Sequence, residues 1–364
     1  MAFLFKRNPK TPGDLVKILN EQVTKLDQSN GSEKKKAQDE ATRHLITLKS
    51  ILNGDDSIFG ESAITSQPEI LNQLSQEIYS CDILSVLITN LADIEFDSRK
   101  IVVLLFNSLL KRKSGNRSPT VDYLVNNPKI ITLLMRGPEL PEVSLNYGIM
   151  LREALKHEVI AKIVIYDPLF WKYFTYVNTD IFEISTDSFA TLKDSLTIHE
   201  KLVGAFFSND AIIDRFITSI NHLMTAGNYV TKRESTKLLA DLIMIKANYK
   251  MMSSYVNNVE NLKIIMLLLG DRSKNIQIEG FNVFKVFVAN PRKEKSVIDI
   301  LTKNRIRLLE FLETFNKERN DDLFIAEKEY IIQQIHLLPK IVMNEKSGEI
   351  KESNLNGKII NEFD

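Results

Sequence analysis

The run that decides the fold is NYVTKRESTKLLADL, residues 228–242. Gly227 and Asn228 suit a turn before a helix. Apolar side chains then recur at spacings near multiples of 3.6, which is typical of a helix with one buried face. These side chains are Val230, Leu238, Leu239 and Leu242. The run therefore predicts a helix that packs one face against a neighbour.

The apolar ridge of this helix ends at a position that recurs along the chain. Ridges end at Leu110, Leu155, Leu196, Leu242 and Phe287, which are 45, 41, 46 and 45 residues apart. A shorter helix with paired apolar residues precedes each of them. A helical recurrence of roughly 40 to 47 residues is typical of HEAT and armadillo repeats. A compact helical bundle would not need so regular a period.

One such unit cannot bury its apolar face alone, whereas stacked units bury a continuous core. We therefore predict an all-α, armadillo/HEAT-like solenoid, a curved rod with one helix of each repeat on its concave face. It forms a single domain over residues 1–343, followed by a polar tail without regular structure over residues 344–364. Polar loops are expected at residues 27–36 and 55–67, and the last helix at residues 326–338.

Composition narrows the classes of partner and compartment. Lys plus Arg and Asp plus Glu both number 47, so the net charge is zero. That balance argues against nucleic acid as the main partner, because phosphate binding usually needs a basic excess. No apolar run approaches the roughly 18 residues of a membrane span, so membrane insertion is not expected. Cys81 is the single cysteine and cannot form an intramolecular disulfide, which fits a reducing compartment, so we expect a cytosolic or nuclear protein.

Motifs that carry catalysis or hold cofactors do not occur in the sequence. There is no Walker-type phosphate loop, no G-x-G-x-x-G and no G-x-S-x-G. The run that starts at Asp271 alternates like a calcium loop, but Ile276 stands at its sixth place, where glycine is needed, and Asn282 at its twelfth. We therefore predict neither an enzyme nor a cofactor.

The histidines do not form a metal-binding pattern, because none lies four residues from another and no cysteine cluster accompanies them. We expect them on the surface or at helix ends. They are His44, His157, His199, His222 and His336.

Two groups of cations remain to be explained. Lys232, Arg233 and Lys237 lie near the start of the helix at residues 228–242, where the helix dipole is already positive. They are either solvated surface residues or a contact surface for an acidic or hydrogen-bonding partner. A second group, Lys111-Arg112-Lys113 with Arg117, either balances the C-terminal dipole of the preceding helix or contacts a partner.

Several long runs together resemble the Mo-twenty-five family, also called calcium-binding protein thirty-nine. The resemblance extends from about residue 3 to about residue 340. Besides Met1-x-Phe3-x-Phe5 and Pro12, the runs are SPTVDY (118–123), NYGIMLRE (146–153), SFATLKD (188–194), NYVTKRESTKLL (228–239), ENLK (260–263), SKNIQ (273–277) and VFKVFVANP (283–291).

The resemblance implies a non-catalytic helical-repeat scaffold that binds and allosterically activates a germinal-centre, or sterile-twenty-like, kinase or pseudokinase. In animals such partners include the STRAD pseudokinase with liver kinase B. In fungi it implies a kinase upstream of an NDR-type kinase, in the RAM pathway for cell polarity, morphogenesis and cell separation. It also implies a cytoplasmic protein that concentrates at sites of polarised growth.

The same resemblance assigns residues to two contact regions. Tyr229, Arg233 and Lys237 match the family's kinase-contacting helix on the concave face. A C-terminal pocket region takes a Trp-Glu-Phe-type tail, and Lys263, Met266 and Lys303 match it.

Three positions depart from the family pattern. Glu234 stands where glutamine is frequent, Lys246 where arginine is common, and Val259 replaces a frequent proline. An acid at position 234 weakens contact with an acidic surface, so these departures bear on partner choice. Two other function classes stay open from the residues: a transport or trafficking adaptor built from helical repeats, and an enzyme with an unrecognised site.

Overall fold

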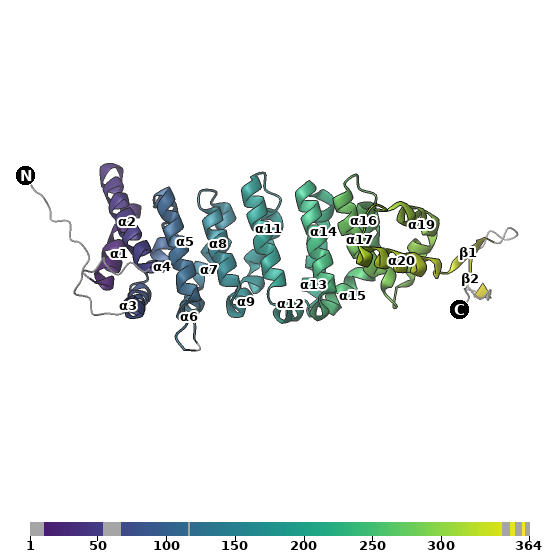
Figure 1. Ribbon diagram of the computed structural model, residues 1–364, viewed down its shortest axis with the longest axis horizontal. Coiled ribbons are helices and arrows are strands. Elements are labelled where there is room, and N and C mark those ends of the chain that lie inside the picture. Colours follow the sequence, from purple (N-terminus) through teal and green to yellow (C-terminus); the bar gives the residue numbers. More distant parts are fainter. Residues whose placement is uncertain (1–10, 54–66, 116, 344–349, 354–358, 361–364) are drawn as a thin grey trace, which may run out of the picture. The chain divides into compact units, whose positions relative to one another are not determined.

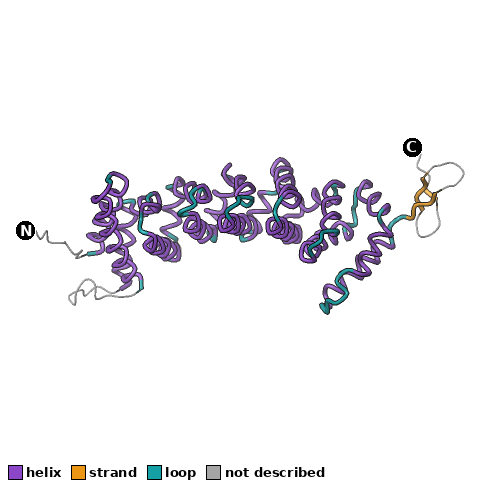
Figure 2. The backbone as a smooth tube through the Cα atoms, turned by 90° about the horizontal axis from the view of Figure 1, so that it is seen from above, coloured by secondary structure: helices purple, strands orange, loops and turns teal. Residues whose placement is uncertain are grey.

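The computed structural model describes residues 11–53, 67–115, 117–343, 350–353 and 359–360. These residues are mostly helical, and their few strand residues lie near the C-terminal end (Figure 2). Backbone contacts divide the chain into two compact units, Met1–His199 (unit 1) and Glu200–Asp364 (unit 2). We describe each unit by itself.

Unit 1 opens with a helical hairpin and continues with three repeats of three helical segments each. In each repeat the last helix is long, and α5, α8 and α11 lie side by side (Figure 1). The hairpin is α1 (Pro12–Gln28) and α2 (Gly31–Leu52), and the repeats are α3 (Gln67–Ser80), α4 (Ile83–Thr89) and α5 (Phe96–Lys111); α6 (Pro119–Asn126), α7 (Pro128–Met135) and α8 (Ser144–Leu155); and α9 (Glu158–Tyr166), η4 (Pro168–Lys172) with α10 (Tyr173–Tyr176), and α11 (Phe182–Thr197). Short 3₁₀ turns, η2 (Leu91–Asp93) and η3 (Gly137–Glu139), join some of them.

Unit 2 repeats the same plan and ends in a small sheet. Its long third helices are α14, α17 and α20, and α17 packs against both of the others. The repeats are α12 (Glu200–Phe206), α13 (Asp210–Ala226) and α14 (Tyr229–Met244); η5 (Lys246–Asn248) with α15 (Tyr249–Val256), α16 (Val259–Leu269) and α17 (Lys274–Ala289); and α18 (Lys295–Lys303), α19 (Arg305–Thr314) and α20 (Asp322–His336). The strands β1 (Lys340–Met343), β2 (Ile350–Ser353) and β3 (Ile359–Ile360) pair antiparallel in that order.

The predicted helical repeat is confirmed. The five ridge ends that set the period lie in α5, α8, α11, α14 and α17, which are the third helices of successive repeats. All five side chains are buried: Leu110, Leu155, Leu196, Leu242 and Phe287. Within each unit these helices pack against their counterparts, α8 against both α5 and α11, and α14 against α17, as expected for stacked units.

Several details differ from the sequence-based expectations. Residues 27–36 are not a loop, because α1 continues to Gln28 and α2 begins at Gly31. Glu33 and the three lysines that follow it are good helix formers even where no apolar face is visible. The last helix begins at Asp322, four residues before the expected start. The expected loop at residues 55–67 lies outside the described residues except for Gln67, which begins α3.

Two further differences from the expectations concern Val230 and the C-terminal tail. Val230 is 38% exposed, so it is not part of the buried face of α14. The segment expected to lack regular structure contains β2 and β3, where isoleucines at positions 350, 359 and 360 favour strand pairing. The single domain over residues 1–343 stays a prediction.

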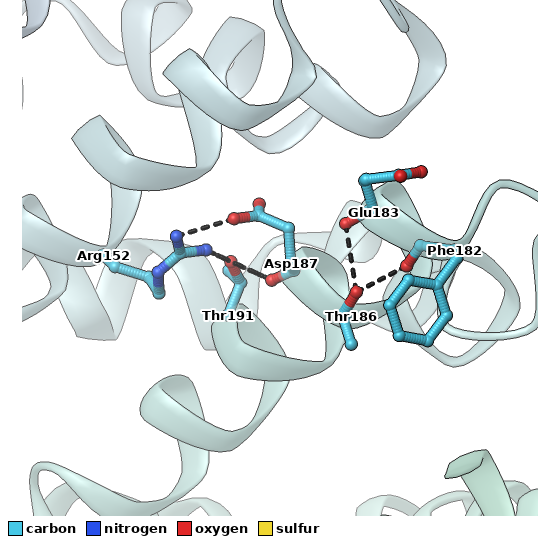
Figure 3. A network of polar contacts seen from close by, with 6 residues as sticks. All are labelled: Arg152, Phe182, Glu183, Thr186, Asp187 and Thr191. Atoms are coloured by element: carbon cyan, nitrogen blue, oxygen red, sulfur yellow. Dashed lines mark hydrogen bonds and ion pairs between the residues drawn. The ribbon is translucent and has the colours of Figure 1, made fainter.

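A polar contact joins α8 to α11 inside unit 1 (Figure 3). Arg152 donates to the Asp187 carboxylate at 2.6 Å, to the Asp187 carbonyl at 3.1 Å and to the Thr191 hydroxyl at 3.0 Å. Gly148 makes room for this contact, because a Cβ there would lie 1.8 Å from a carboxylate oxygen of Asp187. We call Arg152, Asp187 and Thr191 the α8–α11 lock.

Two titratable side chains of unit 1 lie away from the surface: Cys81 is half-buried and His44 is buried. The Cys81 thiol donates to the carbonyl of Glu77 at 2.7 Å, and burial raises the pKa of this thiol. His44 is buried in α2 rather than at the surface as expected, because it follows the apolar spacing of Ala37, Ala41 and Leu48 on one face of that helix.

Candidate partner-binding surface

The start of α14 is fixed by its cap. The side chain of Asn228 accepts a hydrogen bond from the backbone N–H of Thr231 at 3.0 Å, so the helix begins at Tyr229. The buried face that follows is partly polar. The Ser235 hydroxyl donates to the carbonyl of Thr231 at 2.6 Å and the Thr236 hydroxyl to that of Lys232 at 2.7 Å. These small, satisfied side chains allow α14 to pack closely between α13 and α17.

Three of the predicted contact residues lie along the open face of the same helix. Tyr229, Arg233 and Lys237 are spaced by four residues, which places them one above the other. Tyr229 is 51% exposed, and Arg233 and Lys237 are half-buried. The structure therefore brings these three residues together, and we call them the α14 surface.

Residues of the α16–α17 region hold one edge of the α14 surface in place. Asn275 donates from its side-chain amide to the Tyr229 hydroxyl at 3.3 Å. Hydrogen bonds from Asn275 and Ser273 lower the pKa of Tyr229. Lys232 Nζ lies 3.6 Å from a carboxylate oxygen of Asp271. These contacts orient the aromatic ring and neutralise Lys232. Sequence reasoning missed them, because the partners lie one repeat apart.

The remaining cations of the α14 surface have unused hydrogen-bonding capacity. A guanidinium carries five N–H donors. Within the described residues, Arg233 contacts the neighbouring carboxylate of Glu234 at 3.3 Å and its buried Nε–H has no partner. Lys237 forms no hydrogen bond or ion pair with any described residue. The surface can therefore bind an acceptor-rich or acidic group without first breaking a strong internal contact.

An apolar groove lies beside the other end of α14. It is bounded by α14, α17 and α20 and has a volume of about 290 Å³. Apolar walls come from Met244, Val286, Ala289 and Ile331, together with the exposed ring of Tyr330. An ion pair between Lys285 and Glu327, at 2.7 Å, closes one side.

A second groove lies on the other side of α17, against α15. It has a volume of about 440 Å³ and shares Val286 and Ala289 with the first groove. Tyr249 forms its exposed aromatic wall. Sequence reasoning did not find Met244, Tyr249 or Tyr330. The signal that could have found them is a large apolar side chain outside the buried face of its helix.

The second predicted region is less compact in the structure. Lys263 and Met266 lie three residues apart on α16, and Lys263 pairs with Glu260 at 2.6 Å. Lys303 is the exposed last residue of α18, a helix that packs against α16. Among described residues, no hydrogen bond or ion pair joins Lys303 to the other two. Neither groove described above contains any of the three residues.

The three departures from the family pattern lie in or near these regions. Glu234 occupies one donor of Arg233, as described above. Lys246 is exposed in η5, between the two grooves' helices α14 and α15. Val259 is the first residue of α16, and Asn258 caps that helix by accepting from the N–H of Glu260 at 2.8 Å.

The described part of the chain offers no metal centre and no membrane span. There, no three His, Cys, Asp or Glu side chains are grouped so that they could hold a metal ion. None of the described helices is both long and apolar enough to cross a membrane.

Comparison with known proteins gives a consistent result. The Mo25-like family model matches residues 3–339. Protein HYM1 of Saccharomyces cerevisiae is 42% identical over 364 residues, covering 97% of this chain and 89% of that protein. Calcium-binding protein 39-like of Homo sapiens is 42% identical over 340 residues, covering 93% and 98%. Conidiophore development protein hymA of Emericella nidulans is 37% identical over 371 residues, covering 93% and 94%. The chain belongs to the Mo25-like family.

Proposed function

We propose that this protein is a non-catalytic scaffold that binds a germinal-centre, or sterile-twenty-like, kinase or pseudokinase and activates it allosterically. The observation that carries the proposal is the α14 surface, with one ordered aromatic ring and two cations that retain free donors. Aromatic and arginine side chains of this kind dominate binding energy at protein interfaces. Membership of the Mo25-like family supports the choice of partner.

Activation needs no chemistry on the scaffold. A protein that binds the active conformation of a kinase more tightly than the inactive one raises the population of the active conformation. Moving that equilibrium from 1:99 to 99:1 requires a preference of about 5.5 kcal/mol. Several contacts of the size expected for Arg233 and Tyr229 together supply such a preference.

We place the protein in the cytoplasm, at sites of polarised growth, in a pathway that leads through an NDR-type kinase to morphogenesis and cell separation. The name of the Emericella relative, which refers to conidiophore development, is in line with a role in morphogenesis. Loss of the protein is then expected to delay cell separation, which microscopy of a deletion strain measures.

The binding test compares Arg233→Ala with the wild-type protein against a purified germinal-centre-type kinase. Affinity is measured by calorimetry and kinase turnover on a peptide substrate. We expect at least about a tenfold loss of affinity for the variant, because a central arginine is a typical hot spot. Arg307→Ala is the matched control, since Arg307 is an exposed cation of α19 that forms no hydrogen bond or ion pair with the described residues. An equal loss of affinity in both variants, or no loss of affinity in either, would contradict the proposal.

We also propose that Lys263, Met266 and Lys303 receive an aromatic, acidic tail of the partner. Met266 is a half-buried apolar residue one helical turn after the exposed Lys263 on α16, and such a pair suits an aromatic ring followed by a carboxylate. Fluorescence polarisation with a Trp-Glu-Phe peptide measures the affinity. Met266→Ala is expected to weaken the peptide while leaving the affinity at the α14 surface unchanged.

A further inference from the structure

The cations around the turn between α5 and α6 have no role in the proposed scaffold function. We call Lys111, Arg112, Lys113, Ser114 and Arg117 the basic loop. Arg112 donates to the side chain of Asn72 on α3, which fixes the base of the loop. The other three cations are exposed and form no ion pair with any described residue. Four positive charges therefore lie within seven positions of sequence, without a carboxylate partner in the described structure.

The backbone of the basic loop is tightly held at Ser114. The N–H of Ser114 donates to the carbonyl of Arg117 at 2.9 Å, and the N–H of Arg117 donates to the carbonyl of Ser114 at 3.2 Å. Gly115, with φ of 62°, supplies the left-handed conformation that closes the turn. Arg112 has extended backbone angles, so the chain enters Ser114 from an extended segment.

The Ser114 hydroxyl is free. The residue is exposed, and its side chain forms no hydrogen bond with any described residue. Lysine, arginine and lysine stand three, two and one positions before it. An exposed serine after an extended, basic segment is the form of substrate that a kinase with an acidic substrate groove binds, because each cation pairs with a carboxylate of the groove.

We propose that Ser114 is a phosphorylation site for a basophilic serine/threonine kinase that uses ATP. The Ser114 oxygen attacks the γ-phosphorus of ATP, the bond from that phosphorus to the bridging oxygen breaks, and ADP leaves. The hydroxyl proton passes to a carboxylate of the modifying kinase. The site lies in unit 1 and is independent of the α14 surface and of the kinase proposed to bind there.

The product is favoured by the charges already in place. A phosphoserine adds about −1.5 to −2 charges and three strong acceptor oxygens. Lys113 is adjacent to Ser114 in sequence, and Arg117 is joined to Ser114 by two backbone hydrogen bonds. Phosphorylation therefore reduces the repulsion among the cations and adds charge-assisted hydrogen bonds across the turn.

Ser118 is the competing acceptor in the same turn, because Pro119 follows it as a proline-directed kinase requires. It is half-buried at the N-cap position of α6, makes no side-chain capping bond there, and donates from its hydroxyl to the carbonyl of Leu110 at 3.5 Å. Phosphorylation of Ser118 requires its hydroxyl to leave the hydrogen bond with Leu110, which costs free energy. The exposed Ser114 hydroxyl has no such bond to break.

The test incubates the full chain with Mg-ATP and the catalytic domain of a basophilic kinase, and reads phosphate by intact mass and peptide mapping. We expect one phosphate, on Ser114. Ser114→Ala is expected to abolish it, and the double variant Lys111→Gln/Lys113→Gln to slow it by at least about tenfold through loss of charge-assisted pairing. Ser208→Ala, at an exposed serine preceded by apolar residues, is the matched control and is expected to change nothing.

Circular dichroism confirms that each variant is folded before the assay. Phosphate on Ser118 or on any other residue of the wild-type chain, no phosphate at all, or an unchanged rate in the double lysine variant would each overturn the assignment.

Discussion

Arg152 and Arg233 are both half-buried arginines on third helices, but their surroundings differ. Arg152 uses its guanidinium for three hydrogen bonds to the facing helix α11. Arg233 reaches its own neighbour Glu234, and its Nε–H is buried without a partner in the described structure. A buried polar group left unpaired costs free energy. The first arginine therefore stabilises the fold, whereas the second keeps its capacity for a partner.

The largest expected effect is on the α8–α11 lock. Asp187→Ala leaves the Arg152 guanidinium without its carboxylate, so we expect the free energy of unfolding of unit 1 to fall by about 2 to 3 kcal/mol. Urea denaturation measures it. Asp180→Ala, at an exposed aspartate that forms no ion pair with the described residues, is expected to change it by less than about 0.5 kcal/mol. Similar losses for both variants would remove the distinction between a structural and a functional arginine.

A second expected effect on stability comes from His44, a side chain that titrates. It is buried in α2, its Nδ1 has no partner in the described structure, and burial followed by the charge of Arg43 lowers its pKa. The unfolded chain then binds a proton more readily than the folded chain. The contribution of His44 to the free energy of unfolding is therefore complete when the pH is above about 6.5, the ordinary pKa of histidine. It is lost as the pH falls below that value.

The urea midpoint is accordingly expected to be lower at pH 5.5 than at pH 7.5, and His44→Gln to reduce that difference. Burial also lowers the pKa of His157, which contributes in the same direction. His222→Gln, at an exposed histidine, is the control. An equal pH dependence in His44→Gln and the wild type would show that His44 does not carry it.

A smaller effect is expected for the stability of Arg233→Ala. Because Arg233 has little internal bonding to lose, we expect a change of less than about 0.5 kcal/mol in the free energy of unfolding of unit 2. The binding loss expected above therefore reports on contact and not on folding. A loss of stability as large as that of Asp187→Ala would make Arg233 a structural residue.

The smallest effect is expected for Glu234→Gln. The change removes the carboxylate that contacts Arg233 while keeping the shape of the side chain. Half-exposed ion pairs contribute roughly 0.2 to 1 kcal/mol, so affinity for the proposed kinase is expected to rise about two- to fivefold. A decrease in affinity, measured by calorimetry, would mean that Glu234 itself contacts the partner.

The spacing of large apolar residues predicted the repeat, because burial in stacked helices forces a period that is visible in one sequence. It failed where buried residues are small and polar. In α14 the buried positions include Thr231, Ser235 and Thr236, and hydrophobicity alone selected Val230 instead. Satisfied hydroxyls can replace apolar groups at such contacts, and nothing in the local pattern marks them.

The residues of the α14 surface could be predicted, but the hydrogen bond that holds Tyr229 in place could not. The family resemblance assigned Tyr229, Arg233 and Lys237 to one contact region, and their spacing of four residues on α14 places them on one face. The hydrogen bond from Asn275 to Tyr229 joins residues 46 apart, and such a pairing depends on how two repeats pack. Likewise, the scattered placement of Lys263, Met266 and Lys303 depends on the packing of α18 against α16.

The half-buried, hydrogen-bonded setting of Cys81 makes the natural protein a convenient background for spectroscopy. Its thiol is hydrogen-bonded to Glu77 and its pKa is raised, so the reactive thiolate is scarce at neutral pH. Maleimide dyes will therefore react first with cysteines introduced at exposed positions such as Asp180 and Ser208, without removal of the native cysteine.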